Sequence, residues 1–520
     1  MFISVHLWTI LLASCGSKPT DLRTVIPGDT LVYLESNDLG KTLRAITENE
    51  SFRQIAKIQP DLSALDGIQL AVAVTGFETS EQQLTAENSI LNFQPRFVAV
   101  VETNAWNWQA LKFTENKIGE FINQAYGGEI ELETSDKHGG KYFVWTARDG
   151  RKAFALVQGS VIFFGNDESA IEKCLAVKRG EADSIAKNPK ITSGDRLAFG
   201  YISPDGVAQI SNLAGIQLAM GASEESEVKS FIARVLPEIL RNSVKEIEWT
   251  AAKTEWGIDD KYDIELSPVV AKVANETLTA ENFQQYDFAE YVPLEFASAT
   301  RYNLSEPRIA WRSVVLTAQS QTDAQSGRLI AAFSGSLFEP YAIEDPELFL
   351  SSIDERVMTV KLDAEGENAV AIANVKNAVD MKKSIAKEIN FAKPPEKNAD
   401  ADVWKSEDGE LAAAFLGNVV IVGDAESVLK CLAAKQSGEN LTKIERFKRF
   451  EITTASAVTI TNEVGPAAKL VEVFGERKEE TRLLEHRSFA ATWFDEKGMH
   501  RTTLSDFGLI GSIIEQFGKE

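Results

Sequence analysis

The feature that most constrains the fold of this chain is an internal repeat. The segment VWTARDG at residues 144–150 recurs as VWKSEDG at residues 403–409, with the same offset at both ends. Two further matches keep this register to within two residues: GSVIFFG at 159–165 with GNVVIVG at 417–423, and Lys-Cys-Leu at 173–175 with the same triplet at 430–432. Recurrence over this length indicates a duplicated structural unit.

Extending the matches outward predicts two diverged copies, residues 25–266 and residues 291–520. The chain of 520 residues is also longer than the roughly 250–300 residues at which one hydrophobic core stops growing. With 44% apolar and 25% charged residues, each copy has the composition of a soluble globular domain. Residues 267–290 are polar after Pro268, and both a linker and a peripheral helix remain open there.

The pattern within the first copy indicates an α+β fold. Residues 129–165 alternate short strand-forming runs with Gly-Gly, Asp-Gly and Gln-Gly, which is typical of antiparallel hairpins. Further strands are expected at 31–34, 68–74, 97–101, 197–202 and in a hairpin at 246–266, and helices at 39–58, 108–126, 167–178, 206–220 and 227–241. Because the strands come in hairpin runs, each copy should contain antiparallel sheet packed against helices, and a doubly wound nucleotide-binding fold is disfavoured.

The start of the chain resembles a bacterial lipoprotein signal. An uncharged apolar run at residues 5–13 ends in Leu-Ala-Ser-Cys-Gly, with the cysteine at Cys15. The resemblance implies cleavage before Cys15 and attachment of diacylglycerol to its sulfur, so residues 1–14 are the expected signal peptide and 15–24 a tether. Residues 1–6 contain no Lys or Arg, unlike an ordinary secretory signal, so a buried N-terminal strand or helix stays open as the alternative.

A lipid on Cys15 would be the membrane attachment of this protein. Each acyl CH₂ buried in a bilayer contributes about 0.8 kcal/mol, so several chains on one cysteine anchor firmly. No later segment approaches the roughly 20 apolar residues that a membrane-spanning helix needs. Gly16, rather than an aspartate, follows the cysteine, which slightly favours the outer membrane. We therefore expect an exported lipoprotein that faces the periplasm or the cell surface.

The charge balance argues against nucleic acid as a partner. The chain has 77 acidic and 54 basic side chains, for a net charge of -23. Nucleic-acid binding depends on basic side chains that displace counterions from phosphates, and this chain would instead repel them.

The cysteines and histidines do not form a metal-binding pattern. Cys174 and Cys431 occupy matching positions on apolar helix faces, and buried free thiols are favoured there over a bond between the copies. After the expected signal peptide, the histidines are His138, His486 and His500. None belongs to HExxH or neighbours a cysteine, so we predict no metal and no cofactor. His138 is interpreted as part of a polar turn.

The motifs of common catalytic sites are also missing. Gly40-Lys41-Thr42 superficially resembles a phosphate-binding loop, but Glu35 stands where its first glycine is required. No GxSxG element is present, and with 77 carboxylates a catalytic pair cannot be located by sequence. We therefore name no catalytic residue.

Four tryptophans stand out. Trp145 and Trp404 recur at equivalent places in the two copies and are predicted to anchor the cores. Trp106 and Trp108 flank a predicted strand-to-helix junction. Packing under the helix is the first expectation for this pair, and a platform that stacks on sugars is the alternative.

The lipoprotein-like start, the opening VIPGDTLVYLESNDLG, the central YFVWTARDG and the later VIFFGNDESAIEKCL together resemble an uncharacterised family of bacterial exported proteins, classed as a domain of unknown function. The resemblance covers nearly the whole mature chain and implies a location in the cell envelope. It implies no activity, cofactor or catalytic residue.

The features shared by the copies are glycines, a tryptophan, Asp-Gly turns and apolar positions, all of which serve backbone geometry and packing. We therefore expect a non-catalytic envelope lipoprotein that binds or scaffolds another protein, a polymer or an apolar ligand in the groove between its halves. Two alternatives remain: a periplasmic hydrolase that acts on cell-wall or carbohydrate material through a carboxylate pair, and a carrier of lipids or other hydrophobes.

Overall fold

The computed structural model describes residues 20–83, 89–221, 227–279, 288–444, 455–464, 466–478 and 485–516. The chain divides into two compact units: unit 1 comprises Met1–Arg44 and Asp61–Tyr201, and unit 2 comprises Ala45–Pro60 and Ile202–Glu520. The boundaries of these units lie inside the predicted first copy. The two compact units therefore do not coincide with the two copies that the sequence repeat predicts.

The α+β class is confirmed, because each unit combines helices with antiparallel sheet. In unit 1 the strands follow the order β8-β1-β2-β3-β7-β6-β5-β4. Their bounds are β1 Val32–Ser36, β2 Gln69–Gln83, β3 Ser89–Glu102, β4 Glu131–Lys137, β5 Gly140–Thr146, β6 Lys152–Gln158, β7 Val161–Gly165 and β8 Ala198–Ile202.

Helices cover both faces of the unit 1 sheet. Their bounds are α2 Leu39–Thr47, α4 Asn107–Phe113, the π-helical η3 Thr114–Ile118, α5 Gly119–Ala125 and α6 Glu168–Lys178, with short 3-10 turns η1 Leu22–Val25, η2 Ser63–Leu65 and η4 Ile185–Lys187. Phe163 on β7 belongs to the core under α6, whereas its neighbour Ile162 belongs to the core under α4 and α5. This alternation follows from the two-residue period of a strand.

In unit 2 the strands follow the order β9-β10-β20-β19-β18-β11-β12-β13-β17-β16-β15-β14, with antiparallel neighbours throughout. Their bounds are β9 Val244–Thr254, β10 Gly257–Leu266, β11 Ser298–Asn303, β12 Ile353–Lys361, β13 Ala369–Val375, β14 Glu396–Asn398, β15 Ala401–Lys405, β16 Leu411–Leu416, β17 Val419–Asp424, β18 Ala457–Val464, β19 Glu485–Phe494 and β20 Gly498–Ser505.

The helices of unit 2 again lie over both faces of the sheet. Their bounds are α3 Glu50–Ile55, α7 Pro204–Gly221, α8 Glu227–Ser243, α9 Pro268–Thr277, α10 Pro307–Ser320, α11 Ala324–Phe333, α12 Pro346–Ser352, α13 Ala378–Ser384, α14 Ala425–Ser437, α16 Pro466–Phe474 and α17 Gly508–Glu515, with 3-10 segments η5 Ala289–Tyr291, η6 Ser334–Tyr341 and η7 Leu441–Lys443. Ile421 on β17 packs with α14, and its neighbour Val420 packs on the opposite side with α12 and α13.

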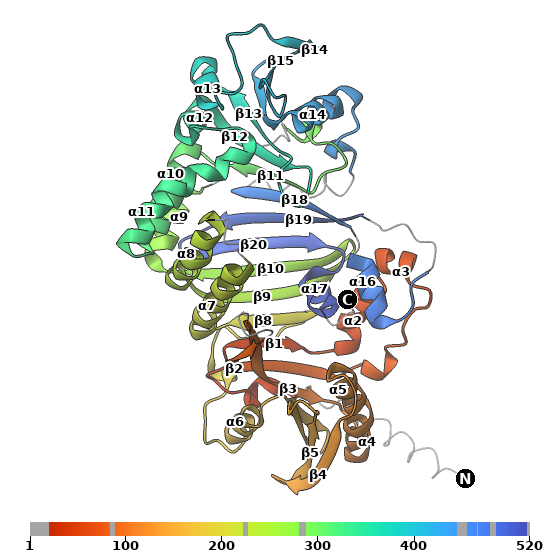
Figure 1. Cartoon of the computed structure of the whole chain (residues 1–520). Coiled ribbons are helices and arrows are strands. Elements are labelled where there is room, and N and C mark those ends of the chain that lie inside the picture. The colour runs from red at the N-terminus through yellow and green to blue at the C-terminus, as the bar shows by residue number, and fades with distance from the viewer. Residues whose placement is uncertain are drawn as a thin grey trace, which may run out of the picture. The chain divides into compact units, whose positions relative to one another are not determined.

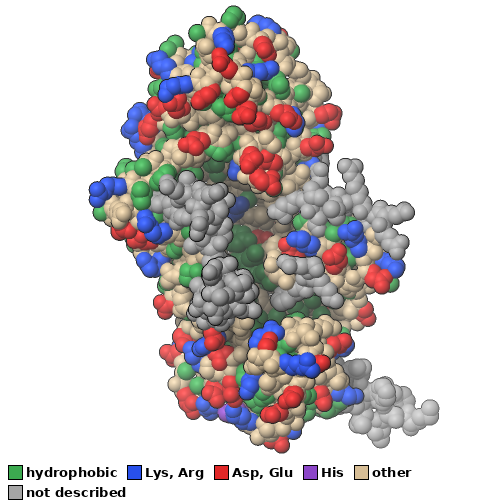
Figure 2. Space-filling view, in the orientation of Figure 1, with side chains coloured by type: hydrophobic (Ala, Val, Ile, Leu, Met, Phe, Trp, Pro, Cys, Tyr) green, Lys and Arg blue, Asp and Glu red, His purple; other side chains and the backbone are tan. Residues whose placement is uncertain are grey.

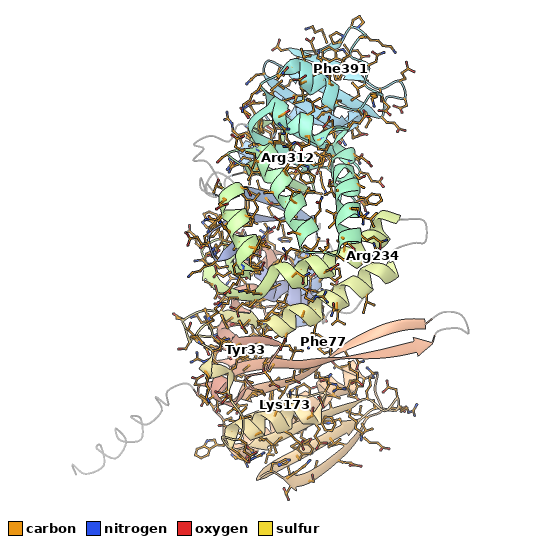
Figure 3. The ribbon with its side chains drawn as sticks, turned by 90° about the vertical axis from the view of Figure 1, so that its left-hand side faces the viewer. Tyr33, Phe77, Lys173, Arg234, Arg312 and Phe391 are labelled. Atoms are coloured by element: carbon orange, nitrogen blue, oxygen red, sulfur yellow. The ribbon has the colours of Figure 1, made fainter. Side chains whose placement is uncertain are left out.

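Most predicted elements of the first copy are present, with local differences. The helix predicted at 39–58 is two helices, because Asn49 interrupts it and accepts a hydrogen bond at its side-chain oxygen from the Ser51 N–H (2.9 Å), which starts α3. The strands predicted at 68–74 and 97–101 are parts of the longer β2–β3 hairpin, which extends beyond the other strands of its unit (Figure 3).

The segment at 267–290 contains a helix, α9, with Pro268 in its first turn, where the missing N–H costs nothing. Residues 280–287 lie outside the described part of the chain. None of the described helices has the length and apolar character that crossing a membrane requires.

The two predicted buried cysteines are confirmed. Cys174 on α6 and Cys431 on α14 are free thiols with no exposed surface. Burial raises the pKa of each thiol to about 12, because the charged thiolate would lose its hydration. Both side chains therefore act as small apolar groups within their cores.

The predicted tryptophan anchors differ. Trp145 is 1% exposed and lies in the core under α5, as predicted. Trp404 is only partly buried at the edge of its core, so the prediction is wrong in degree for the second copy.

Candidate functional site

Segments from distant parts of the sequence meet at one end of the β9-β10-β20-β19 strands in unit 2. The β9–β10 turn lies at this end, and β20 ends here beside the start of β10, with Ile258 paired to Ser505. The helices α3, α16 and α17 gather at the same end (Figure 1). This convergence creates the most chemically varied pocket that the described residues line.

The pocket has a volume of about 520 Å³ and a lining of mixed charge. Its charged residues are Glu48, Glu50, Lys253, Glu255, Arg487 and Asp506. Trp256 adds aromatic surface, whereas Phe489 is fully buried behind the lining. The Lys253 ammonium lies 3.2 Å from a Glu48 carboxylate oxygen. The lining thus holds more carboxylates than cations and suits a polar, positively charged group that can also pack on an aromatic ring.

Asp506 organises the wall of this pocket. It follows β20 directly, precedes α17 and is buried. Its carboxylate oxygen Oδ2 accepts a hydrogen bond from the Ser51 hydroxyl (2.7 Å) and lies 2.7 Å from His486 Nδ1. The Asn49 side-chain amide donates to the Asp506 backbone carbonyl (3.0 Å). Asp506 therefore holds the start of α3 against β19 and β20.

His486 is the buried partner of Asp506. Because a carboxylate can only accept a hydrogen bond, Nδ1 is the donor to Asp506. Nε2 is buried and has no hydrogen-bond partner among the described residues. A cavity of about 50 Å³ adjoins the histidine, Arg487 and Asp506. This space is large enough for ordered water, because about 10–15 Å³ of such volume holds one molecule.

The order of these groups does not activate Ser51 as a nucleophile. A catalytic serine donates to a histidine, which the acid orients from its other side. Here the carboxylate of Asp506 lies between Ser51 and His486 and accepts a hydrogen bond from each. The network can position α3, but it gives the serine no histidine partner of the kind that a catalytic triad has.

A second buried acid, Asp260, lies on β10 near the start of α17. Its oxygens accept hydrogen bonds from the Trp249 indole N–H (2.8 Å) and the Leu509 backbone N–H (2.9 Å). Burial raises its pKa to about 6, because desolvation disfavours the charged form. Gly508 adopts φ of +61°, and a Cβ there would lie 2.6 Å from Ile258. With both oxygens occupied and 1% of its surface exposed, Asp260 secures the end of a helix.

The sequence did not identify this site. Asn49 carries the one local signal, since it is a good helix N-cap residue. Ser51, His486 and Asp506 belong to no motif, and only the sheet brings them together. Cys15, the predicted lipidation site, lies outside the described residues. The polar turn predicted at His138 is confirmed, with φ of +56°. Within the described ranges, His, Cys, Asp and Glu form no cluster of three or more that could hold a metal ion.

Trp106 and Trp108 correct another expectation. They lie at the start of α4 in unit 1, with 75% and 61% of their surfaces exposed. Packing under the helix is therefore wrong for both. The helix instead buries Ala110, which belongs to the same core as Ile122 of α5.

No family model matches the chain, and no curated protein matches it. A solved structure, crystal form IV of TP0453, aligns with 49% of this chain and 84% of its own. The aligned parts are 9% identical in sequence, with a TM-score of 0.24. A score at this level carries no argument about fold or function.

Proposed function

We propose that this protein is a non-catalytic cell-envelope lipoprotein, attached to a membrane by lipid on Cys15, that binds a polar partner in the unit 2 pocket. The partner is a segment of an envelope protein or polymer that carries positive charge. The observation that carries the binding role is the pocket of about 520 Å³, which four carboxylates and the ring of Trp256 line.

The proposal includes the descent of the chain from two copies of one α+β unit. Strand order supports it. The order β8-β1-β2-β3-β7-β6-β5-β4 of unit 1 has the same pattern as the order β18-β11-β12-β13-β17-β16-β15-β14 within unit 2. Each strand has its counterpart in the same sequential place, which is consistent with duplication and not only with a shared fold class.

The central hairpins of unit 2 support the same conclusion. Gly257 begins β10 and Gly498 begins β20, and the two hairpins have the same register when these glycines are matched. The β10–β20 pairing is reciprocal: Ile258 pairs with Ser505 and Ile264 pairs with Met499. Exchanging the two hairpins leaves this pairing unchanged, as expected for a pseudo-twofold relation.

On this proposal the pocket is formed by both copies. Ser51 and Trp256 come from the first copy, and Arg487 and Asp506 come from the second. A pocket at such a junction is unique in the molecule, because neither copy can form it alone. This fits the expectation that the halves bind a partner between them, and its charged lining favours a polar partner over an apolar one.

A photo-crosslinking experiment in cells tests the binding role. A benzoyl-phenylalanine at Gln54, an exposed residue on the pocket rim, should form one defined adduct. Glu50→Lys should abolish that adduct, because it reverses a charge of the pocket. Glu388→Lys is the matched control, since it reverses an exposed charge that does not line the pocket. Absence of any adduct, or equal yields in both variants, would contradict the proposal.

Two further measurements separate this proposal from its alternatives. Mass spectrometry of the mature N-terminus should find an acylated Cys15, and an unmodified one would contradict the lipoprotein assignment. Release of soluble fragments from purified cell wall by the protein would favour the hydrolase. Co-purification of stoichiometric lipid that is not attached to Cys15 would favour the carrier.

A further inference from the structure

We propose that Trp106 and Trp108 insert into the membrane–water interface and hold unit 1 against the lipid surface to which the protein is tethered. This inference rests on the proposed lipoprotein function and deepens it. The two indoles are 75% and 61% exposed, on a helix whose opposite side is packed on the sheet. Tryptophan has an apolar ring and one polar N–H, and it concentrates at the level of lipid headgroups.

The described chain begins beside this pair. The Thr20 hydroxyl donates to a Glu102 carboxylate oxygen (3.4 Å), and the Gln69 side-chain amide donates to the Thr20 carbonyl (3.1 Å). Glu102 ends β3, four residues before Trp106. Four residues lie between Cys15 and Thr20, so the five steps from one Cα to the next span at most about 18 Å when fully extended. A lipid on Cys15 therefore keeps this end of unit 1 close to the bilayer surface.

The turn that carries the indoles is held firmly. Glu102 also accepts a hydrogen bond from the Asn104 backbone N–H (2.8 Å), and the Asn104 side chain donates to the Gly67 carbonyl (2.8 Å). The Gln109 side-chain oxygen then accepts a hydrogen bond from the backbone N–H of Trp106 (3.0 Å) at the start of α4. Because the backbone is already ordered, insertion of the two rings would require little further loss of conformational entropy.

Charge indicates which lipid surface the pair suits. The whole chain has a net charge of -23, which disfavours approach to anionic headgroups. Around the indoles, Lys112 and Lys117 are balanced by Glu115 and Glu120 on the same helical segment. Attachment through the indoles should therefore work on zwitterionic phosphatidylcholine and change little with salt.

Quenching of tryptophan fluorescence by brominated phosphatidylcholine tests the inference on the mature protein. It keeps eight of the nine tryptophans, because Trp8 belongs to the expected signal peptide, so the signal is assigned by difference. We expect brominated vesicles to quench the wild type, and the Trp106→Phe/Trp108→Phe variant to lose at least half of that quenching. Trp493→Phe is the matched control, since Trp493 is exposed but belongs to unit 2, and it should keep the full effect.

A binding measurement gives the second readout. In protein that carries Cys15→Ser and therefore lacks the lipid, Trp106→Ser/Trp108→Ser should lower partitioning onto phosphatidylcholine vesicles by roughly tenfold or more, because two large apolar surfaces are lost. Both side chains are exposed, so the melting temperature should stay unchanged. Equal quenching in the wild type and the Trp106→Phe/Trp108→Phe variant, or no quenching of the wild type, overturns the inference.

The outcomes separate this inference from the proposed function. An acylated Cys15 without quenching of the indoles leaves the lipoprotein assignment standing and removes the role of Trp106 and Trp108. Quenching of the indoles in a protein whose Cys15 is not acylated would remove the lipoprotein assignment and leave the membrane contact of Trp106 and Trp108 standing. Quenching by soluble oligosaccharides, and not by lipid, would assign the pair to sugar stacking and overturn the inference.

Discussion

The β5–β6 hairpin of unit 1 and the β15–β16 hairpin of unit 2 carry matching tryptophans in different surroundings. Trp145 is almost fully buried, stacks on Phe143 at 5.7 Å and lies in contact range of Gly119 on α5. Trp404 is partly exposed at the edge of its core, and its indole N–H donates to the Lys393 carbonyl (2.9 Å). The same motif thus anchors one core and borders the other.

The helices that follow β3 in unit 1 and β13 in unit 2 explain why the two tryptophans differ in burial. After β3, the segment α4-η3-α5 runs over Asn107–Ala125 and covers the ring of Trp145. After β13, α13 is a short helix of seven residues, and the ring of Trp404 packs instead on Phe391 and under the Lys382 ammonium at 4.3 Å (Figure 3 labels Phe391). Sheets with the same strand order can therefore be covered by very different helices.

The largest effect that this comparison predicts is at Trp145. Trp145→Ala should lower the free energy of unfolding of unit 1 by about 3–5 kcal/mol, because it leaves a large cavity in a closed core. Chemical denaturation followed by circular dichroism measures it. Trp145→Phe, which refills most of the space, should cost clearly less. A loss under about 1 kcal/mol for the alanine variant would show that α5 does not seal this core.

The corresponding change in the second hairpin should cost less. Trp404→Ala should destabilise unit 2 by about 1–2 kcal/mol, because the ring is partly exposed and its neighbours can close over the space. The same denaturation experiment applies. If Trp404→Ala were as damaging as Trp145→Ala, the two surroundings would be equivalent in energy and the comparison would fail.

The central hairpins differ in their response to pH. Asp260 on β10 has its pKa raised to about 6 by burial, whereas Arg501 stands at the matched position of β20. The folded state therefore holds the proton of Asp260 at higher pH than the unfolded state, whose value is 3.8. The free energy of unfolding contributed by this group should rise as pH falls from about 7 to about 4, by as much as about 3 kcal/mol.

Two variants check the assignment to Asp260. Asp260→Asn should remove this part of the pH dependence, whatever its effect at one pH. Trp249→Phe removes a donor to the carboxylate and should raise the pKa of Asp260 further, which steepens the dependence near neutral pH. Denaturation profiles from pH 4 to pH 8 measure both. A wild-type profile that is unchanged in Asp260→Asn would exclude this acid as the cause.

The smallest difference is expected at the matched cysteines. Both thiols have a pKa raised to about 12 by burial, so neither Cys174 nor Cys431 should react with Ellman's reagent at pH 8 in the folded protein. Both should react after unfolding in denaturant. Rapid labelling of one thiol in the native state would mean that its core opens locally and that the two helices, α6 and α14, are not equally well packed.

The arrangement of charged side chains on the surface of unit 2 does not follow from the composition of the chain. On the face in Figure 2, acidic and basic side chains are interspersed over the part of unit 2 that contains β12–β17. Many form ion pairs, such as Lys405 with Glu396 and Arg312 with Glu347. Exposed pairs of this kind contribute little to stability. The net charge of the chain argues against nucleic acid as a partner, but it does not locate a binding site.

Sequence patterns predicted the local elements well where a residue type has one dominant preference. Strand alternation and glycine turns predicted β4–β7, and apolar spacing predicted α6 with its buried Cys174. The helix predicted at 39–58 was wrong because an N-cap by Asn49 competes with continued helix, and local propensity alone does not decide between them. Trp106 and Trp108 were misjudged because their exposure depends on which side of α4 meets the sheet.

By itself the sequence determined the α+β class, the buried thiols and the antiparallel hairpins, since these follow from periodicity and from the preferences of single residues. Only the tertiary structure decided the pocket at Asp506. His486 on β19 reaches Asp506 because β19 pairs with β20, and Ser51 is brought to Asp506 by the distant helix α3. The tertiary structure also decided how far each tryptophan side chain is buried. Burial is a property of what covers a side chain, and the covering helices belong to other parts of the chain.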